Sequence, residues 1–310
     1  MSLSTIDLIT VLGPTASGKT QFAVQLALRL GAEIISADSR QVYRGMDLGT
    51  GKDINEYVFN DQQVSYHLVD IVDAGYKYNV FEYQNDFLKV YSKLKEKSIL
   101  PILCGGSGMY IEAVLKGYKL INVPVNEVLR AELDLLSLPE LTAKLGTYKK
   151  LHNRTDVDTK KRAIRAIEIA AFTEMNGEIE LEYPKLNSLI LGINLERELV
   201  RNKITSRLKQ RLREGMIEEV EALIKNGVPT ETLVYYGLEY KYIAQFLNKE
   251  LSYNAMVEKL NIAIHQFSRR QMTWFRKMER EGFNIQWIDG SLSMDEKVSH
   301  ALRLLQQYSK

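Results

Sequence analysis

Residues 13–20 read GPTASGKT and directly follow the apolar run IDLITVL, an arrangement that constrains the fold more than any other part of the chain. Gly13 and Gly18 let the backbone bend close to a diphosphate, so that amide N–H groups and the N-terminus of the next helix point at the phosphate oxygens. Lys19 adds a positive charge, and the hydroxyl of Thr20 can bind Mg²⁺. A turn that binds nothing needs neither Lys19 nor Thr20, so the segment predicts a strand, a diphosphate-binding loop and a helix in that order.

The first third of the chain alternates short apolar runs with longer amphipathic segments, which is typical of a parallel sheet with crossover helices. Helices are expected at residues 20–30 and 81–97, where apolar side chains recur at helical spacing. The expected strands are residues 6–12, 33–36, 67–72, 99–104, 188–195 and 283–288. We therefore predict an α/β fold, a P-loop-type parallel sheet flanked by helices.

Residues 117–186 interrupt this pattern with a segment that contains little resembling a buried strand. Three stretches in it are typical of short helices: VNEVLRAELDLL, LPELTAKL and TKKRAIRAIEIAAF. We expect a smaller helical insertion domain here, lying over one end of the sheet. Residues 1–116 and 187–310 are expected to form the core, with mostly helical segments towards the C-terminus.

Composition narrows the class of protein without identifying it. The 310 residues are 45% apolar, enough for a sizeable core, and the formal net charge of +2 predicts no nucleic-acid binding by itself. Cys104 is the only cysteine, so neither an internal disulfide nor a cysteine-clustered zinc site is expected. The sequence shows no signal-like N-terminus and no apolar run approaching the roughly 20 residues that span a bilayer, and we expect a soluble cytoplasmic protein.

Two further loops follow expected strands, at the edge where open parallel sheets bind ligands. The first, ADSRQVYRGMDLGTGK, contains Asp38, whose carboxylate could hold magnesium-bound water, accept a proton from a nucleophile, or cap a following helix. The second, CGGSGMY, brings Ser107 to the same edge among three glycines, although an ordinary glycine-rich turn has the same composition. From the residues alone, these alternatives stay open.

Basic residues gather in two places. Between positions 144 and 165, eight basic residues stand against two acidic ones. In the expected helix 261–280, the side chains predicted to share a broad apolar face are Phe267, Trp274, Phe275 and Met278. The opposite side carries Arg269, Arg270, Arg276, Lys277 and Arg280. A solvated helix face usually mixes both charge signs, whereas this one holds a single acid, so a phosphate-binding surface and a solvated face are both open.

The motifs by themselves leave several functions open. A P-loop nucleotide kinase or triphosphatase would need an aspartate at a strand end for magnesium, for which Asp70 and Asp73 are the candidates, and an arginine-rich lid. A catalytically silent RNA-binding module is a further alternative.

Six spaced blocks, taken together, resemble the tRNA dimethylallyltransferases over nearly the whole chain. In order along the chain they are GPTASGKT at 13–20, ADSRQVYRGMDLGTGK at 37–52, YHLVDIVD at 66–73, GGSGMYIEA at 105–113, KRAIRAIEI at 161–169 and RRQMTWFR at 269–276. Enzymes of this family transfer a five-carbon isoprenoid from dimethylallyl diphosphate to the N6 amine of an adenosine next to the anticodon. The resemblance implies tRNA and dimethylallyl diphosphate as partners, Mg²⁺ as cofactor, and a monomer.

The resemblance also implies roles for individual residues. Asp38 would take the proton of the adenine amine, Ser107 would hydrogen-bond the diphosphate, and the remaining charges would neutralise it or orient the RNA. The implied catalytic residues are Asp38, Ser107, Lys19 and Arg130. The implied diphosphate ligands are Gly13, Thr15, Ala16, Ser17, Gly18, Lys19, Thr20 and Lys241, with Thr20 also holding the metal. The implied tRNA contacts are Asp38, Ser39, Arg40, Gln41, Lys161, Arg162, Arg165, Arg269, Arg270, Gln271, Trp274 and Arg276.

The chain departs from the family pattern at several positions. Ser107 stands in place of the usual threonine, and Glu239 in place of a glycine that precedes the Tyr-Lys pair containing Lys241. The segment between residues 117 and 161 is shorter than usual, and GTGKD replaces a typical ending in proline. A sister activity, prenyl transfer to free AMP, stays an alternative, but the two basic segments favour RNA because a mononucleotide needs only a few cations.

Overall fold

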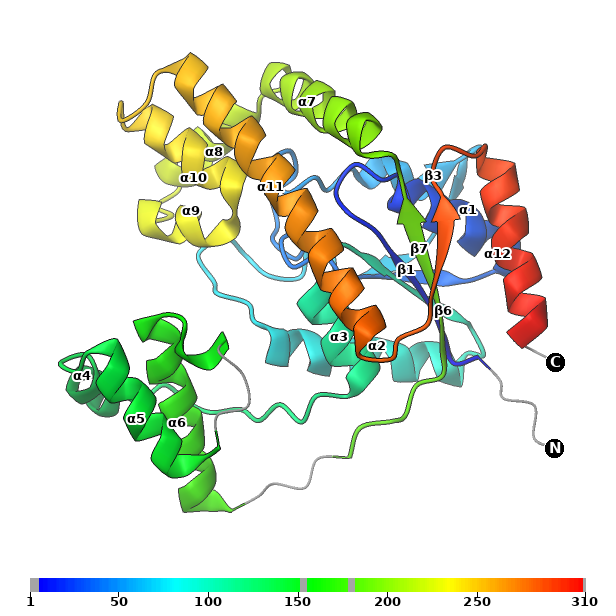
Figure 1. Cartoon of the computed structure of the whole chain (residues 1–310). Coiled ribbons are helices and arrows are strands. Elements are labelled where there is room, and N and C mark those ends of the chain that lie inside the picture. Colours follow the sequence, from blue (N-terminus) through cyan, green and yellow to red (C-terminus); the bar gives the residue numbers. More distant parts are fainter. Residues whose placement is uncertain (1–5, 151–154, 178–181, 309–310) are drawn as a thin grey trace. The chain divides into compact units, whose positions relative to one another are not determined.

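Strand β1, Leu8–Leu12, is buried along its whole length and lies inside a six-stranded sheet (Figure 1). The structure is a computed structural model that describes residues 6–150, 155–177 and 182–308. The sheet has the order β5-β2-β6-β1-β7-β8, and every pairing in it is parallel. The other strands are β2 Glu33–Ser36, β5 Tyr66–His67, β6 Pro101–Gly105, β7 Ser188–Asn194 and β8 Ile285–Asp289. The predicted P-loop-type α/β class is confirmed.

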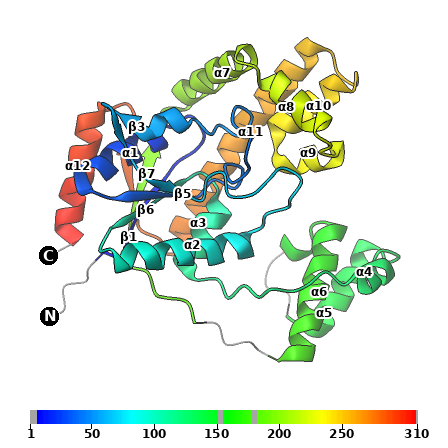
Figure 2. The same cartoon turned by 180° about the vertical axis from the view of Figure 1, so that it is seen from behind.

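Side chains of β1 alternate between two hydrophobic clusters, one on each side of the sheet, as expected of a strand covered on both faces. Ile9 and Val11 belong to the cluster that includes helices α1, Lys19–Leu30, and α12, Met294–Tyr308. Leu8 and Leu12 belong to the other, whose helices are α2 Val80–Glu96, α3 Gly108–Lys116 and α11 Tyr253–Arg280 (Figure 2). The helices thus fix the sheet from both sides and leave the loops at its carboxyl edge to build a site.

The expected strand 67–72 is wrong for most of its length. Leu68 and Asp70 have φ angles of 59° and 54°, which no extended strand can contain, so β5 ends at His67. A short 3₁₀ helix, Ile54–Tyr57, and a hairpin were not expected before it. The hairpin pairs β3, Val58–Phe59, with β4, Gln62–Gln63, through two residues of positive φ at positions 60 and 61. Its Asn-Asp turn was the local signal for it.

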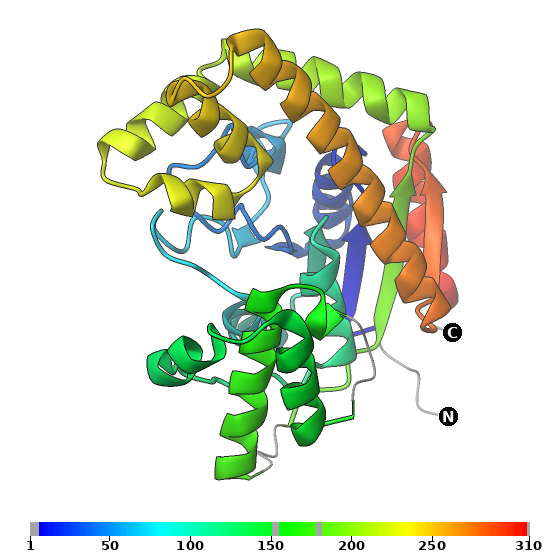
Figure 3. The ribbon, with the colours of Figure 1, turned by 60° about the vertical axis from the view of Figure 1, so that its left-hand side comes forward.

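Five helices lie between β7 and β8 in the chain. They are α7 Arg197–Arg213, α8 Met216–Lys225, α9 Thr230–Tyr236, α10 Leu238–Leu247 and α11. Figure 3 shows the long α11 running from the group α8 to α10 towards the sheet. This helix therefore joins the C-terminal helical group to the core.

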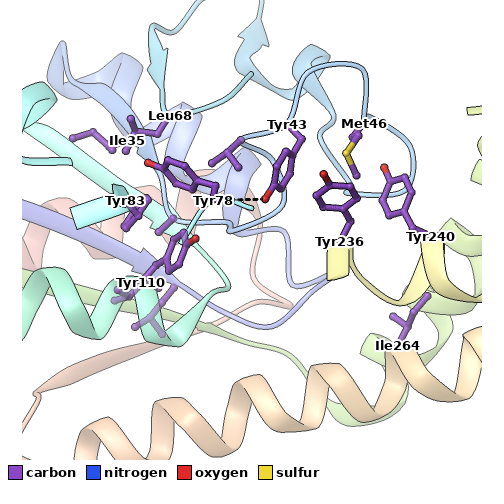
Figure 4. Close-up of a cluster of buried hydrophobic side chains, with 14 of the residues drawn as sticks. Ile35, Tyr43, Met46, Leu68, Tyr78, Tyr83, Tyr110, Tyr236, Tyr240 and Ile264 are labelled. Atoms are coloured by element: carbon purple, nitrogen blue, oxygen red, sulfur yellow. Dashed lines mark hydrogen bonds between the residues drawn. The ribbon is translucent and has the colours of Figure 1, made fainter. Parts of the chain in front are cut away.

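A cluster of buried tyrosines connects this helical group to the loop after β2 (Figure 4). The rings of Tyr43 and Tyr236 lie with centroids 4.5 Å apart, and the Tyr43 hydroxyl accepts the N–H of Tyr78 at 3.1 Å. From α8, the Glu219 carboxylate accepts the N–H groups of residues 47, 48 and 49 at 2.8, 2.8 and 3.1 Å and the hydroxyl of Tyr240 at 2.7 Å. These bonds hold a long, irregular loop in one conformation.

By its contacts, the chain divides into two compact units, Met1–Gly117 with Lys185–Lys310, and Tyr118–Pro184. The second contains α4 Glu127–Leu133, α5 Leu138–Tyr148, a 3₁₀ turn Thr155–Val157 and α6 Lys160–Asn176, around a small apolar core of its own. The three expected helices are therefore present. Arg154, one of the eight expected basic residues, falls outside the described residues, and the placement over one end of the sheet stays a prediction. None of the helices in the described ranges is long and apolar enough to cross a membrane.

Candidate active site

A cavity of about 330 Å³ opens in the first unit, bounded by the three loops at the carboxyl ends of β1, β2 and β6 and by helices α7 to α11. It brings together ten of the residues expected from the sequence to form a site. They are Thr15, Lys19, Thr20, Asp38, Ser39, Arg40, Gln41, Ser107, Arg270 and Gln271. The loops lie side by side because the strands before them are parallel neighbours.

The phosphate loop curves tightly from Gly13 into α1. Ala16 and Gly18 have φ angles of 63° and 84°, and α1 begins at Lys19 with its first N–H groups free of a side-chain cap. A Cβ atom on Gly13 would lie 2.7 Å from Ser17 Oγ and 3.1 Å from the Ile193 carbonyl, so any other residue there would force these neighbours to shift. That Ser17 oxygen is buried and has no hydrogen-bond partner among the described residues. The first N–H groups of α1 thus have no side-chain partner, which suits the binding of an anion at this helix start.

Asp38 faces this loop. Its Oδ1 accepts the N–H of Gly106 at 2.9 Å, and its Oδ2 lies 3.9 Å from Nζ of Lys19. Both side chains are largely buried, with 23% and 12% exposed. No helix starts after Asp38 in the described part of this loop, so the capping alternative is wrong. One carboxylate oxygen is anchored, and the other points towards the cation of the phosphate loop.

Ser107 ties the loop after β6 to the loop after β2. Its Oγ accepts the N–H of Ser39 at 2.9 Å and lies 3.2 Å from the Ser39 hydroxyl, while its own N–H donates to the Ala37 carbonyl at 3.1 Å. A Cβ on Gly105 would lie 2.4 Å from the Ala37 backbone. The glycines of CGGSGMY therefore let two loops pack backbone to backbone.

Two arginines of α7 line the cavity and were not expected from the sequence. Arg207 donates to the hydroxyl of Thr15, and Arg211 pairs with Asp53 at 2.7 Å. Burial, followed by the charge of Arg211, lowers the pKa of the Arg207 guanidinium. Their spacing of four residues, which places both on one face of a helix, was the available signal.

Two carboxylates also belong to this wall, Glu56 and Glu239. Burial raises the pKa of both, with Asp53 adding to the effect at Glu56. Together with the Thr20 hydroxyl and the carboxylate of Asp38, these groups are hard oxygen donors of the kind that bind Mg²⁺ alongside phosphate and water.

Of the cations expected to act on the diphosphate, Lys241 does not line the cavity, and Arg130 belongs to the second unit, so that its role stays a prediction. The ammonium of Lys241 lies 5.3 Å from the ring centroid of Tyr242, and Lys241 is absent from the cavity wall that its neighbour Glu239 joins. Arg130 lies in the second unit, where it pairs with Glu168 through bonds of 3.0 and 2.9 Å.

Arg165 joins Arg130 on the Glu168 carboxylate, whose side chain is 1% exposed. Burial alone would raise the pKa of Glu168, but the two arginines and the N–H of Asn126 outweigh it and lower that pKa. Lys161 and Arg162, on the first turn of α6, are exposed. The basic residues of this unit are therefore of two kinds: arginines that pair with the buried Glu168, and residues exposed on the surface.

Helix α11 differs from expectation at three positions. Phe267 is 40% exposed and lines the cavity rather than being buried. Lys277 is only partly exposed and pairs with the buried Glu112 at 3.1 Å. Gln271, expected to contact tRNA, is buried. Trp274 packs against Gly108, where a Cβ would lie 2.4 Å from its ring. Arg269, Arg270 and Arg276 are exposed, as a surface that meets phosphates requires.

The aspartates that a kinase would need are engaged elsewhere. Asp70 pairs with the buried Lys52, and Asp73 pairs with Arg44 at 2.8 Å. Neither lines the cavity.

These features define a P-loop-type α/β protein whose phosphate loop shares a cavity with the partly buried carboxylate of Asp38. A family model described as IPP transferase matches residues 41–278, and the chain belongs to this family. It is 58% identical over 99% of its length to tRNA dimethylallyltransferase 2 of Bacteroides fragilis strain YCH46, covering 100% of that protein. It is 50% identical over 96% of its length to tRNA dimethylallyltransferase 1 of Geotalea uraniireducens, covering 97% of that protein.

Solved structures agree with this assignment. The tRNA isopentenylpyrophosphate transferase of Bacillus halodurans is 28% identical, with a TM-score of 0.71 over 97% of this chain and 96% of that one. A eukaryotic dimethylallyltransferase acting on tRNA has a TM-score of 0.77 over 97% of this chain and 79% of that one. Its identity of 19% makes that likeness one of fold.

Proposed function

We propose that this protein transfers the dimethylallyl group of dimethylallyl diphosphate to the N6 amine of an adenosine next to the anticodon of tRNA, with release of diphosphate. The main support is the distance of 3.9 Å between Asp38 Oδ2 and Lys19 Nζ in one cavity. A proton acceptor and a diphosphate-binding cation therefore face the same space. The names of the relatives that share more than half of its residues agree with this reaction.

The exocyclic nitrogen of adenine is a poor nucleophile because its lone pair is delocalised into the ring. As its bond to the allylic carbon forms, Asp38 accepts the proton, and the carbon–oxygen bond to the diphosphate breaks. The bonding electrons leave with the diphosphate, whose charge is neutralised by the amides of the phosphate loop, Lys19 and Arg207. Because Gly106 holds one oxygen of Asp38, the other is kept in place for the proton.

Mg²⁺ is the cofactor that we propose for this site. Thr20, at the start of α1, lines the same cavity as the carboxylates of Asp38, Glu56 and Glu239. Mg²⁺ binds through one or two protein oxygens together with phosphates and water, so a larger protein cage is not required. When bound, the ion adds positive charge to the leaving diphosphate.

The proposed RNA partner is supported by exposed basic residues in both units. Lys161 and Arg162 on α6, and Arg269 and Arg276 on α11, present cations of the kind that bind phosphates. A base modified by such an enzyme leaves the anticodon stack and enters the cavity. We expect the protein to act as a monomer in the cytoplasm.

One experiment separates the candidate reactions. The full chain is incubated with Mg²⁺, labelled dimethylallyl diphosphate, and either unmodified tRNA or AMP, and in a parallel reaction with ATP. Label in tRNA supports the proposal. Label in AMP alone, or ATP hydrolysis without any transfer, overturns it.

A further inference from the structure

Gln271, near the middle of α11, spans two loops of the active site with one side-chain amide. Its Oε1 accepts the N–H of Thr15 in the phosphate loop at 2.9 Å, and its Nε2 donates to the carbonyl of Gly106 at 2.9 Å. One partner is a donor and the other an acceptor, so only one orientation of the amide satisfies both. The side chain is 7% exposed, which leaves little of it for a large partner.

The loop that Gln271 holds is the one that holds Asp38. The peptide group of Gly106 accepts from Gln271 through its carbonyl, and the N–H of the same residue donates to Asp38 Oδ1. A continuous set of hydrogen bonds therefore runs from Asp38 through Gly106 and Gln271 to Thr15. Its two ends are the proton acceptor and the loop that would carry the diphosphate.

Glycine at position 106 is matched to this arrangement. A Cβ there would lie 2.4 Å from Gln271 Nε2 and 3.3 Å from Asp38 Oδ1. Any side chain would displace the glutamine amide or the carboxylate. The absence of a side chain at position 106 therefore allows the amide of Gln271 to reach the loop after β6.

We propose that Gln271 is a positioning residue that sets the separation between Asp38 and the phosphate loop, rather than a contact to RNA. This inference rests on the proposed prenyl transfer, because it assigns the two ends of the hydrogen-bonded set to the acceptor and the leaving group. Reacting groups must be aligned closely, and a displacement of about 1 Å can cost about 100-fold in rate. The two hydrogen bonds of Gln271 hold the loops in that alignment before substrate binds.

Gln271→Met is the direct test, because methionine has similar length and makes neither hydrogen bond. Gln266→Met is the matched control, since Gln266 is exposed on the same helix and has no assigned role. Gln271→Glu is the second variant, and the same measurements are made on it if Gln271→Met does not fold. It keeps an acceptor for Thr15 but loses the donor to Gly106.

Four quantities are measured on the full chain: the single-turnover rate of label transfer at saturating tRNA, the Kd for tRNA with its salt dependence, the Kd for inorganic diphosphate with Mg²⁺, and the thermal midpoint. For Gln271→Met we expect the transfer rate to fall about 100-fold and diphosphate binding to weaken several-fold. The Kd for tRNA and its salt slope should stay at the wild-type values. Gln266→Met should match wild type in all four.

Two results overturn the inference: a transfer rate and diphosphate affinity close to wild type, or a loss of tRNA affinity that accounts for the loss of rate. The second result would mean that Gln271 contacts tRNA. If the wild-type protein itself transfers no label, the proposed function fails. The positioning role is then decided by the Kd for inorganic diphosphate, which needs no transfer.

Discussion

The carboxylate of Asp38 and the ammonium of Lys19 lie 3.9 Å apart, and they come from loops that follow two different strands. The distance is too long for a hydrogen bond but short enough for the two opposite charges to attract each other. Substrate can therefore bind to either group without first breaking a hydrogen bond between them. This relationship places proton acceptance and diphosphate binding in one cavity.

Asp38→Asn is expected to lower the transfer rate by about 10²- to 10⁴-fold, because an amide cannot accept the proton of the adenine amine. The amide oxygen of the variant side chain would still accept the N–H of Gly106, so the loop should keep its conformation. Single-turnover label transfer measures the rate, and filter binding measures the Kd for tRNA, which should be unchanged. Asp61→Asn, in the exposed hairpin turn, is the control. A near-normal rate in Asp38→Asn would exclude the proton-acceptor role.

Arg207→Gln is expected to raise the KM for dimethylallyl diphosphate by about 10-fold or more, because it removes a charge that faces the leaving group and a donor to Thr15. Steady-state kinetics at fixed, saturating tRNA measure this. Arg213→Gln changes an exposed arginine of the same helix and should have no effect. Equal KM values for the two variants would mean that Arg207 does not bind the diphosphate.

Replacing Arg269 and Arg276 together with alanine is expected to weaken tRNA binding and to reduce its salt dependence by about one unit of log–log slope for each lost phosphate contact. Titrations of tRNA at several salt concentrations measure both quantities. Arg29→Ala is the control, because Arg29 is an exposed arginine on α1 that pairs with Asp295. An unchanged slope in the double variant would mean that this face of α11 is only solvated.

Glu168 should make the stability of the protein depend on pH under acidic conditions. Its folded pKa lies below the ordinary value, so the unfolded chain binds more protons, and stability falls as pH drops through the ordinary and then the folded pKa. Glu168→Gln should lose this dependence. It should also cost about 1 to 2 kcal/mol near neutral pH, because Gln keeps fewer of the hydrogen bonds and the two partly exposed arginines lose their charged partner.

Thermal unfolding followed by circular dichroism between pH 3 and 7 measures both effects. Glu174→Gln is the control, since Glu174 is exposed on the same helix. A parallel pH dependence of wild type and Glu168→Gln would mean that Glu168 does not contribute to acid sensitivity.

Helix α11 shows why local patterns were insufficient for part of the site. Its buried positions include 264, 268, 271, 275 and 278, a stripe with helical spacing. Ser268 and Gln271 are polar, so an apolar pattern places the buried face elsewhere and includes Phe267, which is exposed and lines the cavity. The spacing of Gln271 from Phe275 and Met278 was the signal that it faces inward.

Charge patterns were similarly incomplete. Lys277 was expected on a basic helix face that either binds phosphates or is solvated, but the buried Glu112 of α3 lies within 3.1 Å of it. The pairing joins residues 165 positions apart, which no local pattern reveals. Arg207 and Arg211 face the cavity for the same reason: the packing of α7 against α11, not the sequence of α7, decides which side of it faces inward.

By itself, the sequence determined the elements whose signals are local. The phosphate loop follows from residues 13–20, the α/β class from alternating apolar runs, and the positions of Asp38 and Ser107 from strand ends. Only the tertiary structure decided which polar side chains face one another across the cavity. Backbone conformation depends on neighbours in the chain, whereas the partner of a side chain depends on which elements pack together. Gln271, which joins Thr15 to Gly106, is the residue whose role changed most for that reason.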